Sequence, residues 1–236
     1  STDLAAGMAI QLAGFLVRVG ELQEARALLD DRLSQQFNHR AVMDSLITAP
    51  GRGTDINTLI ANNIIEVALA SQSEDGRRSL SARLRLALFI APELNYGHLL
   101  LAQELNDVGQ YEEAILHLDR IDVDDVFGQL AQLLKASIVE NMDDPKRAVS
   151  ILEAVIIRNR DNPYLYHRVG DNYRRMQRYA ESRDAYMKAM ALGSDSGALH
   201  RNLGMALERL GDDLAAETHL LRAVEIDPSD SYALNY

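Results

Sequence analysis

The chain has 236 residues, of which 47% are hydrophobic and 25% are charged, so it can bury a sizeable core and is not disordered along its whole length. It contains no cysteine, which excludes disulfide frameworks, cysteine-ligated zinc, iron–sulfur clusters and cysteine nucleophiles. The formal net charge of -11 argues against general nucleic-acid binding, and the longest apolar stretches are far shorter than a membrane span.

Residues 1–56 are predicted to be helical but irregular. Residues 4–32 have apolar residues at helical spacing. We expect a short helix near 39–48 and then a loop over 49–55, whose glycines and proline interrupt the helical pattern. This first stretch has small residues at Ala13, Gly20 and Ala25. Their spacing matches that of the small residues in the 34-residue repeat that begins at residue 61.

From residue 61 to residue 230 the sequence repeats every 34 residues without a gap. Counting each block start as column one, column eight always holds alanine or glycine, and column twenty holds alanine or serine in four of five blocks. Each half-block has helical apolar spacing, and a helix-stop sequence separates the halves. We predict helix pairs that cross closely at the small residues. The five blocks are 61–94, 95–128, 129–162, 163–196 and 197–230.

This pattern resembles the tetratricopeptide repeat (TPR) family, most closely in the last two blocks. The resemblance implies an all-α fold, a right-handed α-solenoid of antiparallel helix-turn-helix units, with TPR-like helices also in residues 1–56. Lys135 in column seven and Leu80 in column twenty depart from the family pattern, so less regular packing is expected there. The residues in signature columns are Tyr166, Val169, Gly170, Tyr173, Ser182, Tyr186 and Ala189 in one block, and Leu203, Gly204, Leu207, Ala216, Leu220, Ala223 and Pro228 in the other.

Residues 231–236 look like the start of a further repeat, so we expect the natural protein to continue beyond Tyr236. An array cut at this point is expected to leave apolar residues partly uncovered, namely Leu207, Leu210, Leu220, Leu221 and Val224. A looser resemblance to long TPR adaptor proteins of Gram-negative bacteria implies a bacterial adaptor or assembly role. It favours the periplasm over the cytoplasm, and the compartment stays open.

Candidate chemical sites are few. His98 and His200 share one column, and His117 and His219 share another, so the repeat explains these histidines as packing or surface residues. The acidic cluster at 122–125 is followed by Val126 and Phe127, not by calcium ligands, and is interpreted as a turn. No phosphate-binding loop or serine-nucleophile motif occurs. We expect no enzyme activity, no metal site and no cofactor.

The resemblance implies a concave groove lined by columns two, five, nine, twelve and thirteen of the first helices. Along the chain these columns change from apolar to basic, which suits an extended or helical peptide with an apolar segment and an acidic end. The competing explanation is that the leucines pack between helices and the arginines pair with Asp171 and Glu208. The expected apolar half is Tyr96, Leu99, Leu130, Leu133 and Tyr164, and the expected basic half is Arg168, Arg174, Arg175, Arg201 and Arg209.

The function favoured by this pattern is a non-catalytic scaffold or adaptor that binds a protein or peptide, possibly acidic, in the groove. The alternative is a structural assembly protein whose repeat faces mediate self-association, and a third possibility is a regulatory segment of a larger enzyme. Column nine contains no asparagine, which argues against a receptor for chaperone tails. We expect no nucleic-acid partner and no membrane contact, and the oligomeric state stays open.

Overall fold

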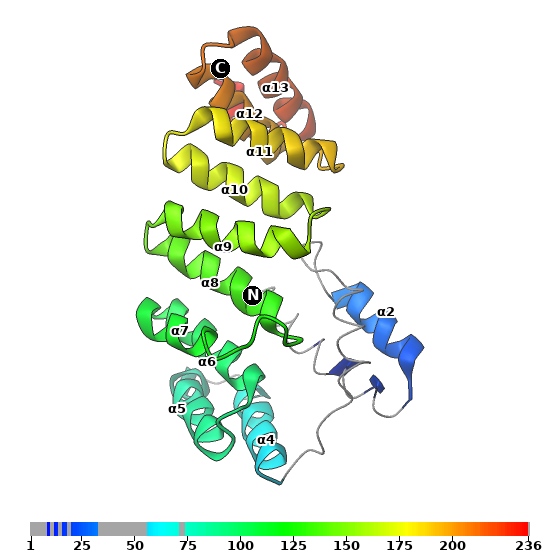
Figure 1. The fold of residues 1–236 in the computed structure, drawn as a ribbon, viewed down its shortest axis with the longest axis vertical. Helices are drawn as coiled ribbons and strands as arrows, with labels where there is room; N and C mark the ends of the chain where they lie inside the picture. The colour runs from blue at the N-terminus through cyan, green and yellow to red at the C-terminus, as the bar shows by residue number, and fades with distance from the viewer. Residues whose placement is uncertain are drawn as a thin grey trace. The chain divides into compact units, whose positions relative to one another are not determined.

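A computed structural model describes residues 9, 12–13, 16–17, 20–32, 56–70 and 74–235 (Figure 1). Across these residues the regular structure is α-helical, and consecutive helices pack in pairs. The expected all-α class and the helix pairs of a TPR-like solenoid are therefore confirmed. The predicted helix near 39–48 and the loop at 49–55 lie outside the described residues. The chain divides into two compact units: unit 1 is residues 1–138 and unit 2 is residues 139–236.

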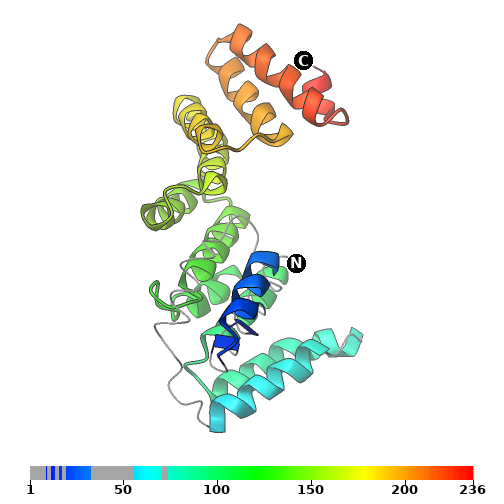
Figure 2. The same cartoon turned by 90° about the vertical axis from the view of Figure 1, so that its right-hand side faces the viewer.

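Unit 1 contains helix pairs that pack in chain order. Helix α4 packs on α5, α5 on α6, and α6 on α7. Figure 2 shows α4 and α5 side by side. The helices are α2 (Leu22–Arg32), α4 (Ile56–Ala70), α5 (Glu74–Ile90), α6 (Asn95–Asp107), α7 (Tyr111–Leu118) and α8 (Gly128–Asn141), whose last residues belong to unit 2.

Unit 2 continues the same pairing, and side-chain caps start most of its helices. Asp144, Asn162 and Ser196 each accept a hydrogen bond from a backbone N–H in the first turn of the following helix. Such a cap satisfies one of the free donors at a helix start and is worth about 1 kcal/mol. The helices are α9 (Pro145–Arg158), α10 (Pro163–Arg175), α11 (Tyr179–Ala191), α12 (Gly197–Arg209), α13 (Asp213–Ile226) and α14 (Ser231–Leu234).

The turn between the two helices of a pair has the same backbone conformation in four successive blocks. Gly109, Asp143, Gln177 and Gly211, all in column fifteen, have φ values of 77°, 58°, 59° and 78°. Left-handed backbone is the common way to end a helix, and glycine adopts it without the steric cost that other residues meet. The turn therefore keeps its conformation even where the sequence supplies aspartate or glutamine.

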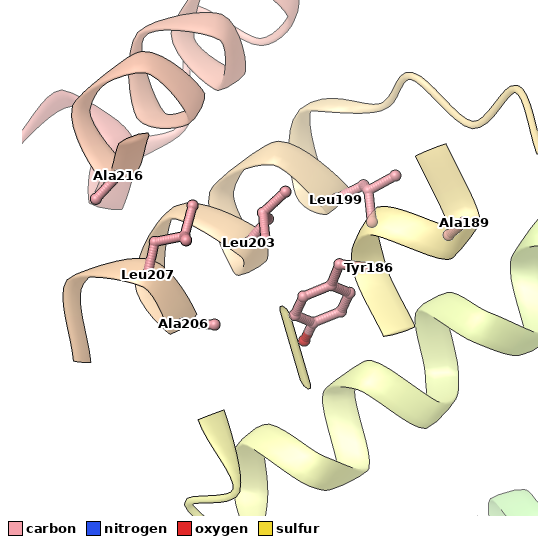
Figure 3. Close-up of a cluster of buried hydrophobic side chains, with 7 residues drawn as sticks. All are labelled: Tyr186, Ala189, Leu199, Leu203, Ala206, Leu207 and Ala216. Carbon is pink, nitrogen blue, oxygen red and sulfur yellow. The ribbon is translucent and has the colours of Figure 1, made fainter. Parts of the chain in front are cut away.

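Small residues in column eight allow the helices of a pair to approach closely. A Cβ atom added to Gly170 would lie 2.4 Å from Cε1 of Tyr186, and one added to Gly204 would lie 2.7 Å from Cγ of Leu220. Figure 3 shows the core that Tyr186 joins. The side chain of Tyr186 is fully buried, so glycine at residue 170 creates the space for a large aromatic side chain. The cluster consists of Tyr186, Ala189, Leu199, Leu203, Ala206, Leu207 and Ala216.

The structure also accounts for the two departures from the family pattern. The ammonium group of Lys135 forms an ion pair with Asp119, so the chain tolerates a lysine at a position that is usually apolar. Leu80 is half-buried and lines a small hollow of about 40 Å³ together with Leu69, Leu84 and Leu100. A larger side chain in column twenty is thus accommodated between α4, α5 and α6.

The C-terminal end is better covered than the sequence suggested. Leu207 and Leu220, two of the five residues expected to be uncovered, are only 6% and 1% exposed. Leu207 packs beside Ala216, and Leu220 lies in a cluster with Ala223 and with Ala233 of α14. The expectation was wrong for these two because the short helix α14 and the pairing of α12 with α13 bury them. Leu210 and Leu221 are exposed, as expected.

Candidate functional site

One face of α10 has a row of polar and aromatic side chains. Tyr164, His167, Asp171 and Arg174 follow one another at steps of three and four residues, so they lie along one side of the helix. Tyr164 is 39% exposed, and the guanidinium carbon of Arg168 lies 5.8 Å from the centre of its ring. This distance is within the range of a cation–π contact, which orients the tyrosine at the start of the helix.

Glu140 near the end of α8 is the centre of the first polar cluster in unit 2. The guanidinium of Arg168 donates to Oε2 of Glu140 at 2.6 Å, and the amide of Asn172 donates to Oε1 at 2.7 Å. Arg175 donates to the backbone oxygen of Glu140 at 3.1 Å and to Asp143 at 2.6 Å. Arg168 is 9% exposed and Asn172 is 1% exposed. Glu140 therefore holds two largely buried donor groups, whereas the pair of Arg175 with Asp143 lies at the surface.

Asp171 is the centre of the second cluster. Its Oδ1 atom accepts hydrogen bonds from the hydroxyl of Tyr186 at 2.7 Å and from the amide of Asn202 at 2.8 Å. The imidazole of His167 lies 3.8 Å away. Burial lowers the pKa of His167, the nearby cations Arg201 and Arg174 lower it further, and Asp171 opposes the change. His167 thus lies between charged groups of α10 and α12 that shift its pKa in opposite directions.

Arg201 is also matched by an internal carboxylate. Its guanidinium donates to Asp230 at 2.8 Å, and the side chain of Asp230 is only 4% exposed. Asp230 caps α14 through the backbone N–H groups of Tyr232 and Ala233. The competing explanation of the sequence pattern, in which arginines pair internally, therefore holds for Arg168, Arg175 and Arg201. Their partners are Glu140, Asp143 and Asp230 in place of the expected Asp171 and Glu208.

Arg174 and Arg209 differ from these three arginines. Neither forms an ion pair with another of the described residues. The Nε atom of Arg174 is buried and has no hydrogen-bond acceptor. Arg209 is exposed at the end of α12. The side chain of Arg174 also lies within hydrogen-bond reach of the hydroxyl of Tyr186.

The expected apolar half lies almost entirely in unit 1 and is buried. Tyr96 and Leu99 on α6 are 2% and 4% exposed, and Leu130 and Leu133 on α8 are also 2% and 4% exposed. The ring of Tyr96 stacks on Phe127 with centroids 5.8 Å apart. Nearly every residue of the first half of α6 is buried, which explains why these side chains pack within the unit. They offer a partner little surface, and the candidate site is confined to unit 2.

Sequence reasoning missed the partners in these contacts. Glu140 belongs to column twelve of the expected groove but was not expected to pair with an arginine, and Asn172, Asn202 and Asp230 were not singled out. A signal exists in the spacing, because the residues of each contact are separated by 28 to 32 positions, slightly less than one repeat. A carboxylate followed by an arginine or asparagine at that spacing indicates a contact between successive first helices.

The acidic cluster at 122–125 forms a turn. Asp122 and Asp125 each accept a hydrogen bond from a backbone N–H two residues later, as expected for turn residues. No group of three or more histidine, aspartate or glutamate side chains in the described part of the chain is arranged to hold a metal ion. Among the same residues, each helix is too short or too polar to cross a bilayer.

Comparison with known proteins agrees with this architecture. Residues 161–229 match the sequence model of the tetratricopeptide repeat family. The solved structure of MamA 41-end from Desulfovibrio magneticus RS-1 is 18% identical with a TM-score of 0.65, and the match covers 76% of this chain and 99% of that one. YrrB, described as a TPR protein with an unusual peptide-binding site, is 14% identical with a TM-score of 0.61, covering 78% and 98%. No curated protein matches the chain.

Proposed function

We propose that this chain is a non-catalytic interaction scaffold that binds an acidic segment of a protein or peptide on the α10–α12 face of unit 2. The observation that carries the proposal is that Arg174 and Arg209 form no ion pair with a described residue, whereas Arg168, Arg175 and Arg201 each pair with a carboxylate of this chain. A carboxylate or a peptide carbonyl oxygen is the acceptor that a guanidinium group prefers.

The geometry supports separate roles for the residues of this face. Arg168, Arg175 and Arg201 fix the spacing of the helices through their internal carboxylates. Arg174 and Arg209 remain as cations for a ligand, and Tyr164 supplies exposed aromatic surface at the start of α10. Exposed ion pairs are each worth only about 0–1 kcal/mol, so we expect modest affinity that rises when the peptide also covers Tyr164.

The test is selection of peptides from a displayed random library on the full chain, followed by titration of a selected peptide. We expect the selected peptides to be enriched in aspartate and glutamate. Arg174→Glu should weaken binding about tenfold and flatten its salt dependence, because an attraction of up to about 1 kcal/mol is lost and a repulsion replaces it. Arg183→Glu on α11 is the matched charge control, since Arg183 pairs with its neighbour Asp184 away from this face.

Two results would reject the proposal. One is a selection that yields no acidic peptides. The other is equal loss of affinity in the Arg174 and Arg183 variants, which would show an effect of net charge only.

A second candidate function is self-association through unit 2. Leu214 and Leu221 lie on one side of α13 and are 81% and 59% exposed, which is unusual for leucines one heptad apart. Light scattering during size-exclusion chromatography tests this directly. If α13 mediates assembly, the chain will be larger than a monomer and the double change Leu214→Glu, Leu221→Glu will return it to the monomer mass. A monomeric wild-type chain rejects this candidate.

A further inference from the structure

Two histidine pairs join the helices of two different helix pairs in the same way. Histidine pair 1 is His98 on α6 and His117 on α7, with their Nδ1 atoms 2.9 Å apart. Histidine pair 2 is His200 on α12 and His219 on α13, also with Nδ1 atoms 2.9 Å apart. The ring centroids are 5.1 Å apart in both pairs, so the rings point their Nδ1 atoms at each other. This is the geometry of an N–H···N hydrogen bond between two helices.

The surroundings of the inner histidine determine which nitrogen carries the proton. In pair 1, Nε2 of His98 lies 2.8 Å from the backbone oxygen of Pro92, which is only an acceptor. In pair 2, Nε2 of His200 lies 2.8 Å from Oδ1 of Asp195. Nε2 of each inner histidine is therefore protonated, and in the neutral ring Nδ1 has a free lone pair. The outer histidine, His117 or His219, must then donate from its own Nδ1–H.

This arrangement separates the effects of a first and a second proton. The outer ring has its free lone pair on Nε2, so it takes up one proton without breaking the bond between the helices. A second proton has to enter at Nδ1 of the inner ring, which is the acceptor of that bond. His98 and His200 are 4% and 5% exposed, so the second proton also places a charge in the interior next to another charge.

We propose that the two histidine pairs form an acid-sensitive lock between the helices of their repeats, closed while each pair holds at most one extra proton and opened by the second. Each lock ties the first helix of a pair to the second, at equivalent positions three periods apart. Its loss at acid pH loosens α6 from α7 and α12 from α13 without any change of sequence or ligand. The lock does not depend on the proposed peptide site.

The charged neighbours make the two locks unequal. Pair 1 is faced by the cations Arg85 and Arg120 and by Glu93 and Glu113, and its inner ring donates to an uncharged carbonyl group. In pair 2 the inner ring donates to the carboxylate of Asp195, which also binds Arg222. A carboxylate stabilises an imidazolium ion better than a carbonyl group does. The second proton therefore enters pair 2 more readily, and pair 2 is expected to open at a higher pH than pair 1.

The pH dependence of stability has a definite sign. Burial is the main cause that lowers the pKa of His98, His117 and His219 below the ordinary value of 6.5. The unfolded chain takes up these protons near that ordinary value, whereas the folded chain takes them up at lower pH. At pH values between the pKa of the unfolded chain and that of the folded chain, the unfolded state binds more protons. The contribution of these histidines to stability is therefore full above about pH 6.5 and falls as the pH decreases.

The decisive experiment is a nitrogen-15 NMR titration of the histidine rings in the full chain from pH 8 to pH 4.5. At pH 8 we expect His98 and His200 as Nε2–H tautomers and His117 and His219 as Nδ1–H tautomers. On acidification the outer rings should change first. The inner ring of pair 1, His98, should change last. Outer rings that are Nε2–H tautomers at pH 8, or inner rings that titrate before the outer ones, would overturn the proposal.

A variant pair provides the second test. Asparagine at residue 117 or 219 offers an amide N–H near the position of Nδ1–H but cannot be protonated. We expect His117→Asn, His219→Asn to fold at pH 8 and to lose part of the acid sensitivity. In the wild type the unfolding equilibrium constant should rise about tenfold for each unit by which folding lowers a histidine pKa. His167→Gln is the control for a buried histidine outside the pairs, and equal effects of both changes would contradict the lock.

Discussion

The first helices of unit 1 and unit 2 occupy the same place in the repeat but are built from different chemistry. In α6 the inner positions hold Tyr96 and Leu99, which are buried by hydrocarbon contacts. In α10 the buried residues include Arg168 and Asn172, which are held by Glu140. Hydrocarbon packing is not directional, whereas each hydrogen bond has a defined partner and angle. The repeat thus uses one architecture for an apolar packing layer and for a polar one whose side chains have defined hydrogen-bond partners.

The largest loss of stability is expected from changes in column eight, where both units have a small residue at the helix crossing. Gly170→Leu should destabilise unit 2 by roughly 2–4 kcal/mol, because any side chain at residue 170 meets the ring of Tyr186. Ala102→Leu in unit 1 should have a similar effect, since Ala102 is fully buried in the same column. Thermal melts of both variants test this. A melt of the Gly170 variant that is unchanged within error would show that column eight is not the helix crossing.

A smaller loss of stability is expected from changes in column twelve, and it should differ between the two units. Glu140→Ala should cost about 2–3 kcal/mol, because Arg168 and Asn172 lose their acceptor while largely buried. This loss is smaller than that for a fully buried ion pair because the Glu140 side chain is 22% exposed. Asn106→Ala is the matched change in unit 1 and should cost no more than about 0.5 kcal/mol. Urea unfolding measures both, and equal costs would remove the distinction between the units.

The smallest effect concerns the turn in column fifteen. Gln177→Gly should stabilise unit 2 by about 0.5 kcal/mol, because relief of left-handed strain exceeds the added entropy of the unfolded chain. Gly109→Ala in unit 1 should destabilise by about 1 kcal/mol, since alanine there acquires the same strain. Calorimetric midpoints of the two variants should therefore move in opposite directions. Movement in the same direction would show that the turn conformation is not what distinguishes them.

The sequence predicted the features that depend on periodicity and missed those that depend on distance. A 34-residue period with small residues such as Gly170 and Gly204 is enough to predict helix pairs, because only small residues allow the observed approach to Tyr186 and Leu220. Columns alone do not show which side chains meet. The contact of Arg168 with Glu140, or of His98 with His117, depends on the helix crossing and on side-chain rotamers.

The candidate site was predicted only in part for the same reason. The basic positions were identified from their columns, but three of five arginines are matched by acids that lie nearly one repeat away. The apolar positions were identified as well, but a column assignment does not distinguish a side chain that faces a groove from one that is covered. Leu99 and Leu130 are covered because α6 and α8 are buried on more than one side.

The burial of two tyrosines gives each unit an optical label of its own. The chain has no tryptophan, so its near-ultraviolet spectrum comes mainly from nine tyrosines. Tyr96 in unit 1 and Tyr186 in unit 2 are at most 2% exposed, and burial raises the pKa of each phenol far above its ordinary value of 10. In alkaline solution the exposed tyrosines ionise first. The later tyrosinate absorbance therefore reports opening of the interior, and replacing one buried tyrosine by phenylalanine assigns that absorbance to a unit.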